Sequence, residues 1–500
     1  MTPPLDLPQD STPLWGEVEA GEPDSLDADG VDVVIVGAGL VGLTTALSLA
    51  ERGVRPLVLE AVRPGFGTTG GSTAKVTLLQ GALADQIARV HGHETLSTHL
   101  RANRLGQERM REILGGDDPE DRDAWTFATD EQGERRVVAE AAALQRAGVL
   151  AEIAVPTELP FEVRSAVRLR GQFQVDPASY LTRLTDLARQ AGARVSWPYR
   201  VTGVESAGDE LKVVLDVGEE IRAKHVVLAT LMPFPLRTAL FAAARASRSY
   251  TVAGVPSTDI PQGMYISAGS PTRSFRQAQD DQGQPLLLVG GYGHPTGKEN
   301  PARRHLDELA QWAGETFSLT GFTHRWSAQD YLSADRLPHV GPSPFGPDGL
   351  LVATGFGKWG FTNGTAAAEL LAGTITGATP DWAPIWRPRL AKSARGWGRL
   401  LAANAEVGVD LTAGWVVDPA HAKGDPGEGE GQVVRGRGKP TAISKVGGTR
   451  RACSAVCTHL GGIVRWNDAE ATWDCPLHGS RFAADGAVVT GPATTPLPPK

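Results

Sequence analysis

Near the N-terminus the apolar residues change from a continuous run to a helical spacing and back again. Val31 to Val36 is almost entirely apolar, which predicts a strand buried on both faces, as in a parallel sheet. An apolar helix is expected from Leu40 to Arg52, with Gly53 at its C-terminal end. Val54 to Leu59 then predicts a second buried strand. The order strand, helix, strand is typical of an α/β domain.

The remaining chain alternates between helical and strand-like patterns. Residues from Leu78 to about Gly148 are charged at helical spacing, and Asp176-Pro177 favours a helix start, because Asp caps the helix and Pro suits its first position. That helix is expected to reach about Gln190. Further strands are expected over 161–173, 194–197, 201–205, 211–217, 226–229, 264–275, 286–292 and 350–354, and further helices over 301–317 and up to about 375.

Length and composition set the limits of what this chain can be. Its 500 residues allow roughly three domain-sized units. The formal net charge of −8 argues against nucleic acid as the main partner. Only 3 Cys are present, which fits a reducing compartment. We find no signal-peptide pattern and no apolar stretch near the ~20 residues that cross a bilayer, so a cytoplasmic location is expected.

A glycine motif joins the first strand to the first helix. Gly37 permits a tight turn, Gly39 lets the backbone approach a pyrophosphate at the helix N-terminus, and Gly42 permits close helix–strand packing. Glu60 ends the next strand, about twenty positions later, where a carboxylate accepts hydrogen bonds from ribose hydroxyls. The motif therefore predicts a dinucleotide site, and by itself it leaves NAD and FAD both open.

Two further glycine-rich stretches favour FAD. Residues 65–75, Gly-Phe-Gly-Thr-Thr-Gly-Gly-Ser-Thr-Ala-Lys, form a small, hydroxyl-rich loop that can lie against a flat ring. Residues 355–364 form a glycine-rich turn before a helix, whose N-terminus favours the negative charge of a reduced flavin. Both stretches resemble the D-amino-acid oxidase / glycine–sarcosine oxidase family. The resemblance implies FAD as cofactor and contacts to it from Thr68, Thr69, Val201, Gly355, Gly357, Lys358, Trp359 and Gly360.

Three residues are candidates for catalysis. His294 ends a glycine-rich strand and could face a substrate, although a lone His is more often structural. Lys75 and Lys358 lie in the two stretches that resemble the oxidase family, and Lys75 could equally be a structural or solvated lysine. An arginine clamp would indicate a substrate carboxylate, and without one an amine lacking a carboxylate is favoured. The candidates for such a clamp are Arg273, Arg276, Arg325 and Arg336.

Near the C-terminus two short loops each carry one Cys and one His. The first contains Cys457 and His459, and the second contains Cys475 and His478. A structural Cys2His2 zinc site usually places like ligands next to each other, whereas here Cys and His alternate. The loops resemble those of the Rieske [2Fe–2S] family. That resemblance implies that the two Cys bind one iron and the two His bind the other, with Ser480 as a further hydrogen-bond donor.

This Rieske-like segment departs from its respiratory relatives at three positions. Gly462 and Leu477 stand where those proteins carry a disulfide, and Phe482 stands where they carry a Tyr that donates to a ligand sulfur. Since Phe cannot donate, we expect a redox potential near the low end of the Rieske range, about −150 mV rather than +300 mV.

Together these features predict an α/β FAD-binding Rossmann-like domain with an interleaved α+β substrate domain, followed by a small all-β Rieske domain. The expected boundaries are an arm over 1–30, FAD-binding segments over about 31–80, 171–231 and 325–378, substrate-domain segments over about 81–170 and 232–324, a linker over 401–431 and the Rieske domain over 432–500.

The expected activity is hydride removal from a small amine or amino acid, with electrons leaving through the cluster to an unidentified acceptor. Two alternatives stay open. An external donor could reduce the cluster, which would then feed the flavin for a reductive or oxygenating reaction. The chain could also be a redox-sensing electron-transfer module without metabolic turnover.

Overall fold

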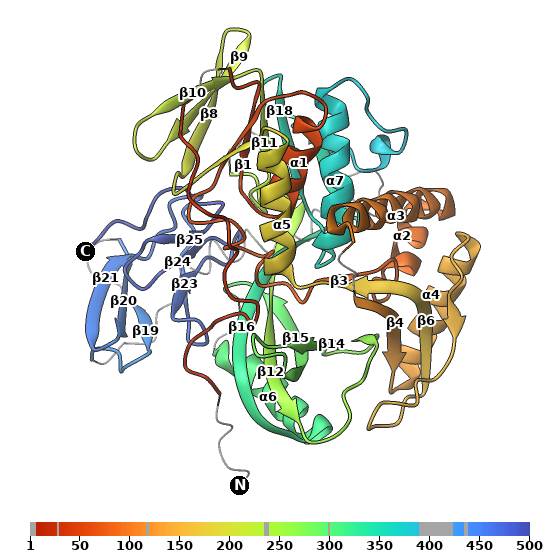
Figure 1. Cartoon of the computed structure of the whole chain (residues 1–500). Coiled ribbons are helices and arrows are strands. Elements are labelled where there is room, and N and C mark those ends of the chain that lie inside the picture. Colours follow the sequence, from red (N-terminus) through yellow and green to blue (C-terminus); the bar gives the residue numbers. More distant parts are fainter. Residues whose placement is uncertain are drawn as a thin grey trace.

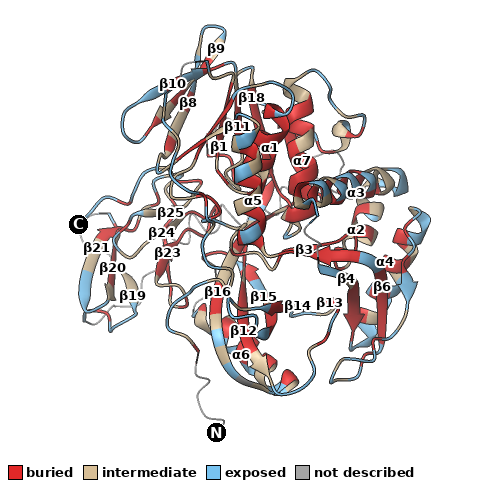
Figure 2. Ribbon diagram, in the orientation of Figure 1, coloured by how far each residue is buried: buried red, intermediate tan, exposed pale blue. Residues whose placement is uncertain are grey.

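The computed structural model describes residues 7–27, 30–116, 120–234, 240–298, 301–389, 424–434 and 439–500. Figure 1 shows α1 (Leu40–Ala50), α5 (Pro177–Gln190) and α7 (Gly360–Ile375) near the middle of the molecule, β12 (Ala244–Pro256) and β16 (Leu319–Ser333) below them, and the C-terminal strands on the left. Figure 2 shows that burial is concentrated in α1, α7 and β1 (Val33–Val36) and along the strands of the lower sheet. Within these ranges, none of the helices combines the length and the apolar character that crossing a membrane requires.

A six-stranded sheet forms the centre of the first region, in the order β17-β18-β11-β1-β2-β7. Val33 and Ile35 face the helices α1, α5 and α7, whereas Val34 and Val36 face a three-stranded meander, β10-β9-β8. Both faces are therefore covered, which explains the continuous apolar run of β1. The elements are β1 (Val33–Val36), α1 (Leu40–Ala50), β2 (Pro56–Leu59), α5 (Pro177–Gln190), β7 (Arg194–Ser196), β8 (Val201–Ala207), β9 (Glu210–Leu215), β10 (Glu220–Ala223), β11 (His225–Leu228), β17 (His339–Pro342), β18 (Leu350–Thr354) and α7 (Gly360–Ile375).

The second region is a nine-stranded sheet, β16-β12-β15-β14-β13-β4-β6-β3, with β5 paired to β6. Its inner strands and α6 enclose an aromatic core that includes Phe127, Tyr265 and Phe275. The strands are β3 (Lys75–Val76), β4 (Glu120–Ala128), β5 (Glu152–Ile153), β6 (Ser165–Gln174), β12 (Ala244–Pro256), β13 (Met264–Ser267), β14 (Arg273–Gln279), β15 (Pro285–Pro295) and β16 (Leu319–Ser333), and the helices are α2 (Leu83–His91), α3 (His93–Leu114), α4 (Glu131–Arg146) and α6 (Arg303–Phe317). A short 3-10 turn, η2 (Leu240–Ala242), precedes β12.

Two predictions for this sheet are wrong. The stretch expected to be helical throughout contains the strand β4, whose buried residues 124–128 are preceded by four charged ones that hide the strand pattern. The single strand expected over 264–275 is two strands, β13 and β14. Gly269 and Pro271 lie between them, and both residue types favour a turn over a continuing ladder.

The C-terminal region is all-β, as predicted. It contains the sheets β19-β20-β21 and β22-β23-β24-β25, packed around Trp466, Trp473 and Phe482. The Gly429 N–H donates to the Lys445 carbonyl over 2.8 Å, so residues just before the expected boundary at 432 also join this region. Most of the linker predicted over 401–431 lies outside the described residues. The strands are β19 (Gly431–Val434), β20 (Thr441–Val446), β21 (Thr449–Ser454), β22 (Arg465–Asn467), β23 (Thr472–Asp474), β24 (Arg481–Phe482) and β25 (Val488–Thr490).

The N-terminal arm contacts both the nine-stranded sheet and the C-terminal region. Residues 7–27 form no helix or extended strand, and Thr12 makes a single bridge to Arg325. Trp15 anchors the arm, since its indole N–H donates to the Ser72 carbonyl over 2.8 Å. The Ser11 hydroxyl donates to Glu470 of the C-terminal region, so the arm connects the two regions.

Candidate functional site

A cleft of about 460 Å³ runs from the carboxyl ends of β1 and β2 to the edge of the nine-stranded sheet. Ten of the predicted cofactor and catalytic residues line it: Gly37, Gly39, Glu60, Thr68, Thr69, Lys75, Val201, Lys358, Trp359 and Gly360. Because ligands of open α/β sheets bind outside the carboxyl ends of the strands, this is where a dinucleotide would lie.

The glycine motif has the close packing that the sequence predicted. Gly37 has φ +105°, and a Cβ there would stand 2.8 Å from the Ala229 carbonyl oxygen. A Cβ at Gly42 would stand 1.9 Å from the Gly37 carbonyl oxygen, so α1 could not pack against this turn with any other residue. Gly42 thus shapes the turn without lining the cleft, which leaves the helix N-terminus open to a pyrophosphate.

The carboxylate of Glu60 is held by backbone N–H groups at the end of β2. Its oxygens accept from Ala38 over 2.9 Å and from Val62 over 3.0 Å. Burial raises the pKa of Glu60, and these hydrogen bonds oppose that effect. Glu60 therefore lies beside the turn that would hold the pyrophosphate, and its role as a ribose acceptor stays a prediction.

The loop over 65–75 connects α1 to the nine-stranded sheet. The Thr69 hydroxyl accepts from the Leu40 N–H over 3.2 Å, at the first turn of α1. The Thr68 hydroxyl donates to the Gln329 carbonyl over 2.5 Å, which fixes the loop to β16. A flat ring lying along this loop would therefore contact both regions of the chain.

The second glycine turn brings a Lys and an Asp together at the same cleft. Asp330, on β16, accepts from the Lys358 backbone N–H, and burial raises its pKa to about 6. The Lys358 ammonium donates to the Ser249 hydroxyl over 2.6 Å, and burial lowers its pKa. Lys358 has φ +75°, and Gly355 and Gly357 shape the same turn without lining the cleft. The turn leads into α7, whose N-terminus faces the cleft.

Lys75 is half-buried, and the hydrogen bonds of its amine go to hydroxyl groups. Its Nζ lies 3.3 Å from the Ser274 hydroxyl and 3.4 Å from the Thr73 hydroxyl. Burial, with a smaller effect from the charge of Arg276, lowers its pKa to about 7. A lysine of this kind exchanges a proton near neutral pH and can act as a general base.

His294 lies outside the lining of the cleft in the described chain, although its neighbour Gly293 belongs to that lining. The imidazole stacks on His305 at 4.4 Å, and its Nε2 lies 3.3 Å from the Tyr250 hydroxyl oxygen. The geometry therefore fits the structural alternative for His294.

None of the four candidate clamp arginines is among the cleft-lining residues of the described chain. Arg273 stacks on Trp312 at 4.6 Å, and Arg276 donates to the Val175 carbonyl over 3.0 Å. Arg325 donates to the Ala469 carbonyl over 2.9 Å, in contact with the C-terminal region. The cations that do line the cleft are Lys75, Lys358, Arg200 and Arg481.

The four predicted cluster ligands converge at the tips of two loops. The Cys457 and Cys475 thiols hydrogen-bond to each other, and the rings of His459 and His478 lie 5.3 Å apart at 89°. His459 Nε2 and His478 Nδ1 are buried without a hydrogen-bond partner. No group of three or more His, Cys, Asp or Glu is arranged for a single metal ion in the described chain. A Rieske cluster requires two ligands on each of two irons, which these pairs can supply.

Protonation and hydrogen bonding prepare these side chains for iron. Burial lowers the pKa of His459 to about 4 and that of His478 to about 3, so both rings are neutral near pH 7. The mutual thiol contact lowers the pKa of Cys457 and raises that of Cys475. Backbone N–H groups of residues 459 and 460 donate to Cys457, and those of 477 and 478 donate to Cys475. Such bonds stabilise thiolate ligands and raise the cluster potential.

Two of the predicted departures also have their place in this geometry. A Cβ at Gly462 would stand 2.7 Å from the Leu477 side chain and 3.1 Å from the Cys475 sulfur. The two positions that carry a disulfide in respiratory relatives are thus neighbours here. The Ser480 hydroxyl hydrogen-bonds to the Cys457 thiol, as the sequence suggested.

The second cluster loop is docked on the strand that lines the cleft. The Gln329 side-chain amide donates to the Gly479 carbonyl over 2.8 Å, and the Tyr331 hydroxyl donates to the His478 carbonyl over 2.7 Å. Both side chains come from β16, and Gln329 also lines the cleft. One residue therefore contacts the flavin loop through its backbone and the cluster loop through its side chain.

A buried ion pair and an aromatic ring complete this contact. Arg248 is fully buried, and its Nε lies 3.6 Å from Asp474, the residue before Cys475. Phe241, on η2, packs edge-on against the ring of His478 at 4.9 Å. The face of the C-terminal region that carries the His ligands is therefore directed at the rest of the chain.

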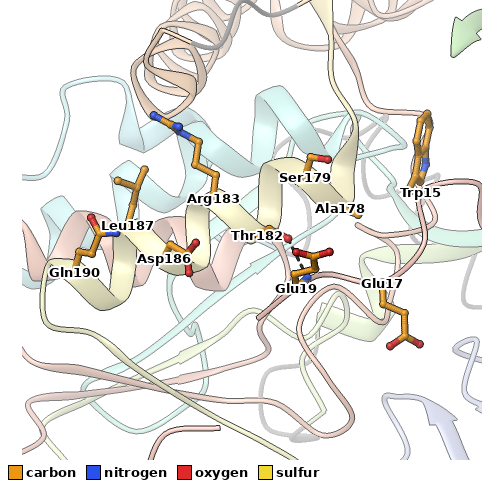
Figure 3. A pocket seen from close by; sticks show the side chains of 10 residues that line it. All are labelled: Trp15, Glu17, Glu19, Ala178, Ser179, Thr182, Arg183, Asp186, Leu187 and Gln190. Carbon is orange, nitrogen blue, oxygen red and sulfur yellow. Dashed lines mark hydrogen bonds between the residues drawn. The ribbon is translucent and has the colours of Figure 1, made fainter. Parts of the chain in front are cut away.

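Another cavity, of about 600 Å³, lies between the arm and α5 (Figure 3). In Figure 3 the Glu19 backbone reaches the Thr182 hydroxyl, a hydrogen bond of 3.0 Å. Although its volume is the larger, this cavity has none of the residues predicted for a cofactor among its lining.

Several residues of the site had no signal in the sequence. The strand β16 contains no recognisable motif, and its pairing in the sheet determines the roles of Gln329, Asp330 and Tyr331. The segment from Val489 to Thr494 lies in the C-terminal region and yet lines the cleft, which no local pattern indicates.

Comparison with known proteins agrees with both predicted domains. Residues 32–374 match the family model of FAD dependent oxidoreductases, and residues 415–499 match that of the Rieske [2Fe-2S] domain. Over 473 residues the chain is 32% identical to YhfW of Bacillus subtilis (strain 168), which is named as a Rieske 2Fe-2S iron-sulfur protein. This match covers 93% of the chain and 92% of YhfW.

Solved structures show the same fold at lower identity. The L-amino acid deaminase from Proteus myxofaciens has a TM-score of 0.58 at 19% identity, over 73% of this chain and 94% of the deaminase. Glycine oxidase from Geobacillus kaustophilus has a TM-score of 0.57 at 19% identity, over 72% of this chain and 98% of the oxidase. At these identities the likeness concerns the fold.

Proposed function

The chain belongs to the family of FAD-dependent oxidoreductases and ends in a Rieske [2Fe-2S] domain, and on this premise we propose that it dehydrogenates a small amine or amino acid and passes the electrons to its own cluster. The solved relatives with this fold include an L-amino acid deaminase and a glycine oxidase, which supports a substrate with a C–N bond.

The observation that carries the proposal is the shared strand between the two sites. Gln329 lines the FAD cleft, and its amide donates to Gly479 in the second cluster loop over 2.8 Å. Tyr331 adds a second hydrogen bond, to the carbonyl of His478 itself. A flavin bound in the cleft and a cluster held by the loops would contact neighbouring residues of one strand, which supports direct electron transfer between them.

Each group has a distinct task in this proposal. When bound, FAD supplies an acceptor for a hydride from the carbon beside nitrogen, and the cluster supplies a one-electron acceptor. The substrate must arrive as a neutral amine, because an ammonium has no lone pair to assist hydride loss. Lys75, with a pKa of about 7, can accept that proton inside the cleft. Asp330 holds the turn of Lys358, so the second amine is fixed in place.

The positively charged side chains that line the cleft indicate which class of substrate it can bind. The four arginines considered for a carboxylate clamp are absent from the lining of the described cleft. The two arginines that do line it are engaged by other groups, since Arg200 donates to the Val488 carbonyl and Arg481 donates to Asp474. Both guanidinium groups therefore have partners that compete with the planar, bidentate contact that a carboxylate prefers. This favours a small amine over an α-amino acid as the substrate.

The proposal is tested by anaerobic titration of the oxidised protein with pairs of compounds that differ only in a carboxylate. We expect a small amine to bleach the flavin absorbance, followed by the electron paramagnetic resonance signal of the reduced cluster. An amino acid that reduces the flavin faster than its amine counterpart would overturn the substrate preference.

The same experiment distinguishes the direction of electron flow. If no compound bleaches the flavin, while a reduced ferredoxin or an NADH-linked donor reduces the cluster before the flavin, electrons flow inward and the proposed dehydrogenation is wrong. If neither treatment moves electrons between the two centres, a redox-sensing role takes its place.

A further inference from the structure

The end of the Rieske domain forms part of the wall of the FAD cleft. The segment from Val489 to Thr494 lines the cleft together with residues of the first glycine motif. Just before it, the Val488 carbonyl accepts from the Arg200 guanidinium over 3.1 Å. Arg200 itself lines the cleft near Glu60, whose charge acts on it. The Rieske domain thus contributes one side of the cavity, at the end where the adenosine diphosphate part of a dinucleotide would lie.

Both cluster loops hold this wall segment in place. From the first loop, the Thr458 hydroxyl donates to the Thr495 carbonyl over 2.7 Å. From the second loop, the Ser480 hydroxyl oxygen accepts from the Ala493 N–H over 3.0 Å. Ser480 also hydrogen-bonds to the Cys457 thiol. A continuous path of two hydrogen bonds therefore connects the cleft wall with a ligand of the cluster.

Binding of the cluster at one end of this path should change how rigidly the wall segment is held at the other end. Metal ligation contributes to the folding free energy of small metal-binding loops, so both cluster loops are less constrained without iron. Loss of that constraint frees Ser480 and Thr458, which are the anchors of the wall segment. Without these hydrogen bonds the wall segment is held less firmly against a bound dinucleotide. Coupling between two binding sites acts equally in both directions, so bound FAD should in turn stabilise the cluster loops.

We propose that the segment from Val489 to Thr494 is part of the FAD-binding site, and that the bound cluster slows the release of FAD by fixing this segment. The coupling concerns retention of the cofactor, so it holds whichever substrate the enzyme takes and in whichever direction electrons flow.

The test measures FAD release from the full-length protein without substrate. Release is followed by the rise in flavin fluorescence after dilution, and cluster content by visible absorbance and by the electron paramagnetic resonance of the reduced protein. In Ser480→Ala the wall loses one hydrogen bond, and we expect FAD release up to about tenfold faster while the cluster remains. In Cys475→Ser, which cannot hold the cluster, both anchors loosen and we expect at least about tenfold faster release.

A matched pair of variants tests the wall directly, even if the cluster-free variant misfolds. Thr494 is half-buried and lines the cleft. Because the diphosphate of FAD is negatively charged, Thr494→Asp should release FAD about tenfold faster than the nearly isosteric Thr494→Asn. Equal release from these two variants would overturn the contact. Wild-type release from a folded Cys475→Ser protein would overturn the coupling to the cluster. Neither outcome bears on the oxidation of amines, which is measured separately by bleaching of the flavin.

Discussion

Gly297 packs directly against the backbone of the second cluster loop. A Cβ added there would stand 2.8 Å from the Pro476 nitrogen and 3.0 Å from both the Asp474 oxygen and the Cys475 carbonyl carbon. These are backbone atoms of the second cluster loop, so they cannot move aside as a flexible side chain would. Overpacking of this kind costs about 1–3 kcal/mol. The φ of +69° adds about 1 kcal/mol for any residue with a Cβ.

Gly283→Ala is the matched control for Gly297→Ala. Gly283 has φ +77° and open space around its added Cβ, so only the backbone term of about 1 kcal/mol applies. The remaining 1–3 kcal/mol in Gly297→Ala weakens the contact between the cluster loop and the cleft strand. We therefore expect a lower unfolding temperature than in the control and slower reduction of the cluster after flash reduction of the flavin. If Gly297→Ala unfolds like Gly283→Ala and reduces its cluster at the wild-type rate, this packing argument is refuted.

Three further predictions concern Lys75, Arg248 and Phe482. Lys75 is protonated below its pKa of about 7 and neutral above it, so the rate of flavin reduction by an amine should increase as the pH rises through 7. Lys75→Met should remove this increase, and a pH profile that the substitution leaves unchanged would exclude Lys75 as the base. Arg248→Met should lower the free energy of unfolding in urea by about 3 kcal/mol, because the buried carboxylate of Asp474 loses one of its partners. Arg450→Ala is the control, because it removes an exposed ion pair and should lower the free energy of unfolding by less than about 1 kcal/mol. Redox titration should place the cluster near −150 mV because Phe482 cannot donate to a ligand sulfur, and a clearly positive value would contradict this.

Sequence patterns correctly predicted the helices and strands that are determined by residues close to them in the chain. The helix over Pro177–Gln190 begins where expected because Asp176 caps it through two N–H groups and Pro177 suits its first turn. The helix beginning at Leu40 and the strand Leu350–Thr354 are likewise defined by neighbouring residues. The cluster loops were predictable for the same reason, since both ligands of each loop are separated by one or two residues.

Sequence patterns were less informative where a residue's environment is set by distant strands. The buried half of β4 is surrounded in sequence by charged helices, and only its partners β6 and β13 make it a central strand. The role of His294 depended on which side of β15 faces the cleft, and a glycine-rich strand end gives no alternation from which to read it. The sequence offered four arginines as candidates for a carboxylate clamp and could not say which of them faces the cleft. In the fold, three of them pack an aromatic side chain or hold backbone carbonyls.

The contact between the two domains lay furthest from what the sequence could predict. Gln329, Tyr331 and Gly297 belong to no motif, and each acts only because β15 and β16 bring it to the second cluster loop. Their bonds go to backbone atoms of that loop, so the loop's own sequence carries no complementary signal either. A fused cluster domain could in principle serve any external partner, and its motif would be the same. What ties it to this flavin site is the geometry of a few backbone hydrogen bonds, so variants at these three residues test the joint action of the two domains more directly than removal of either cofactor.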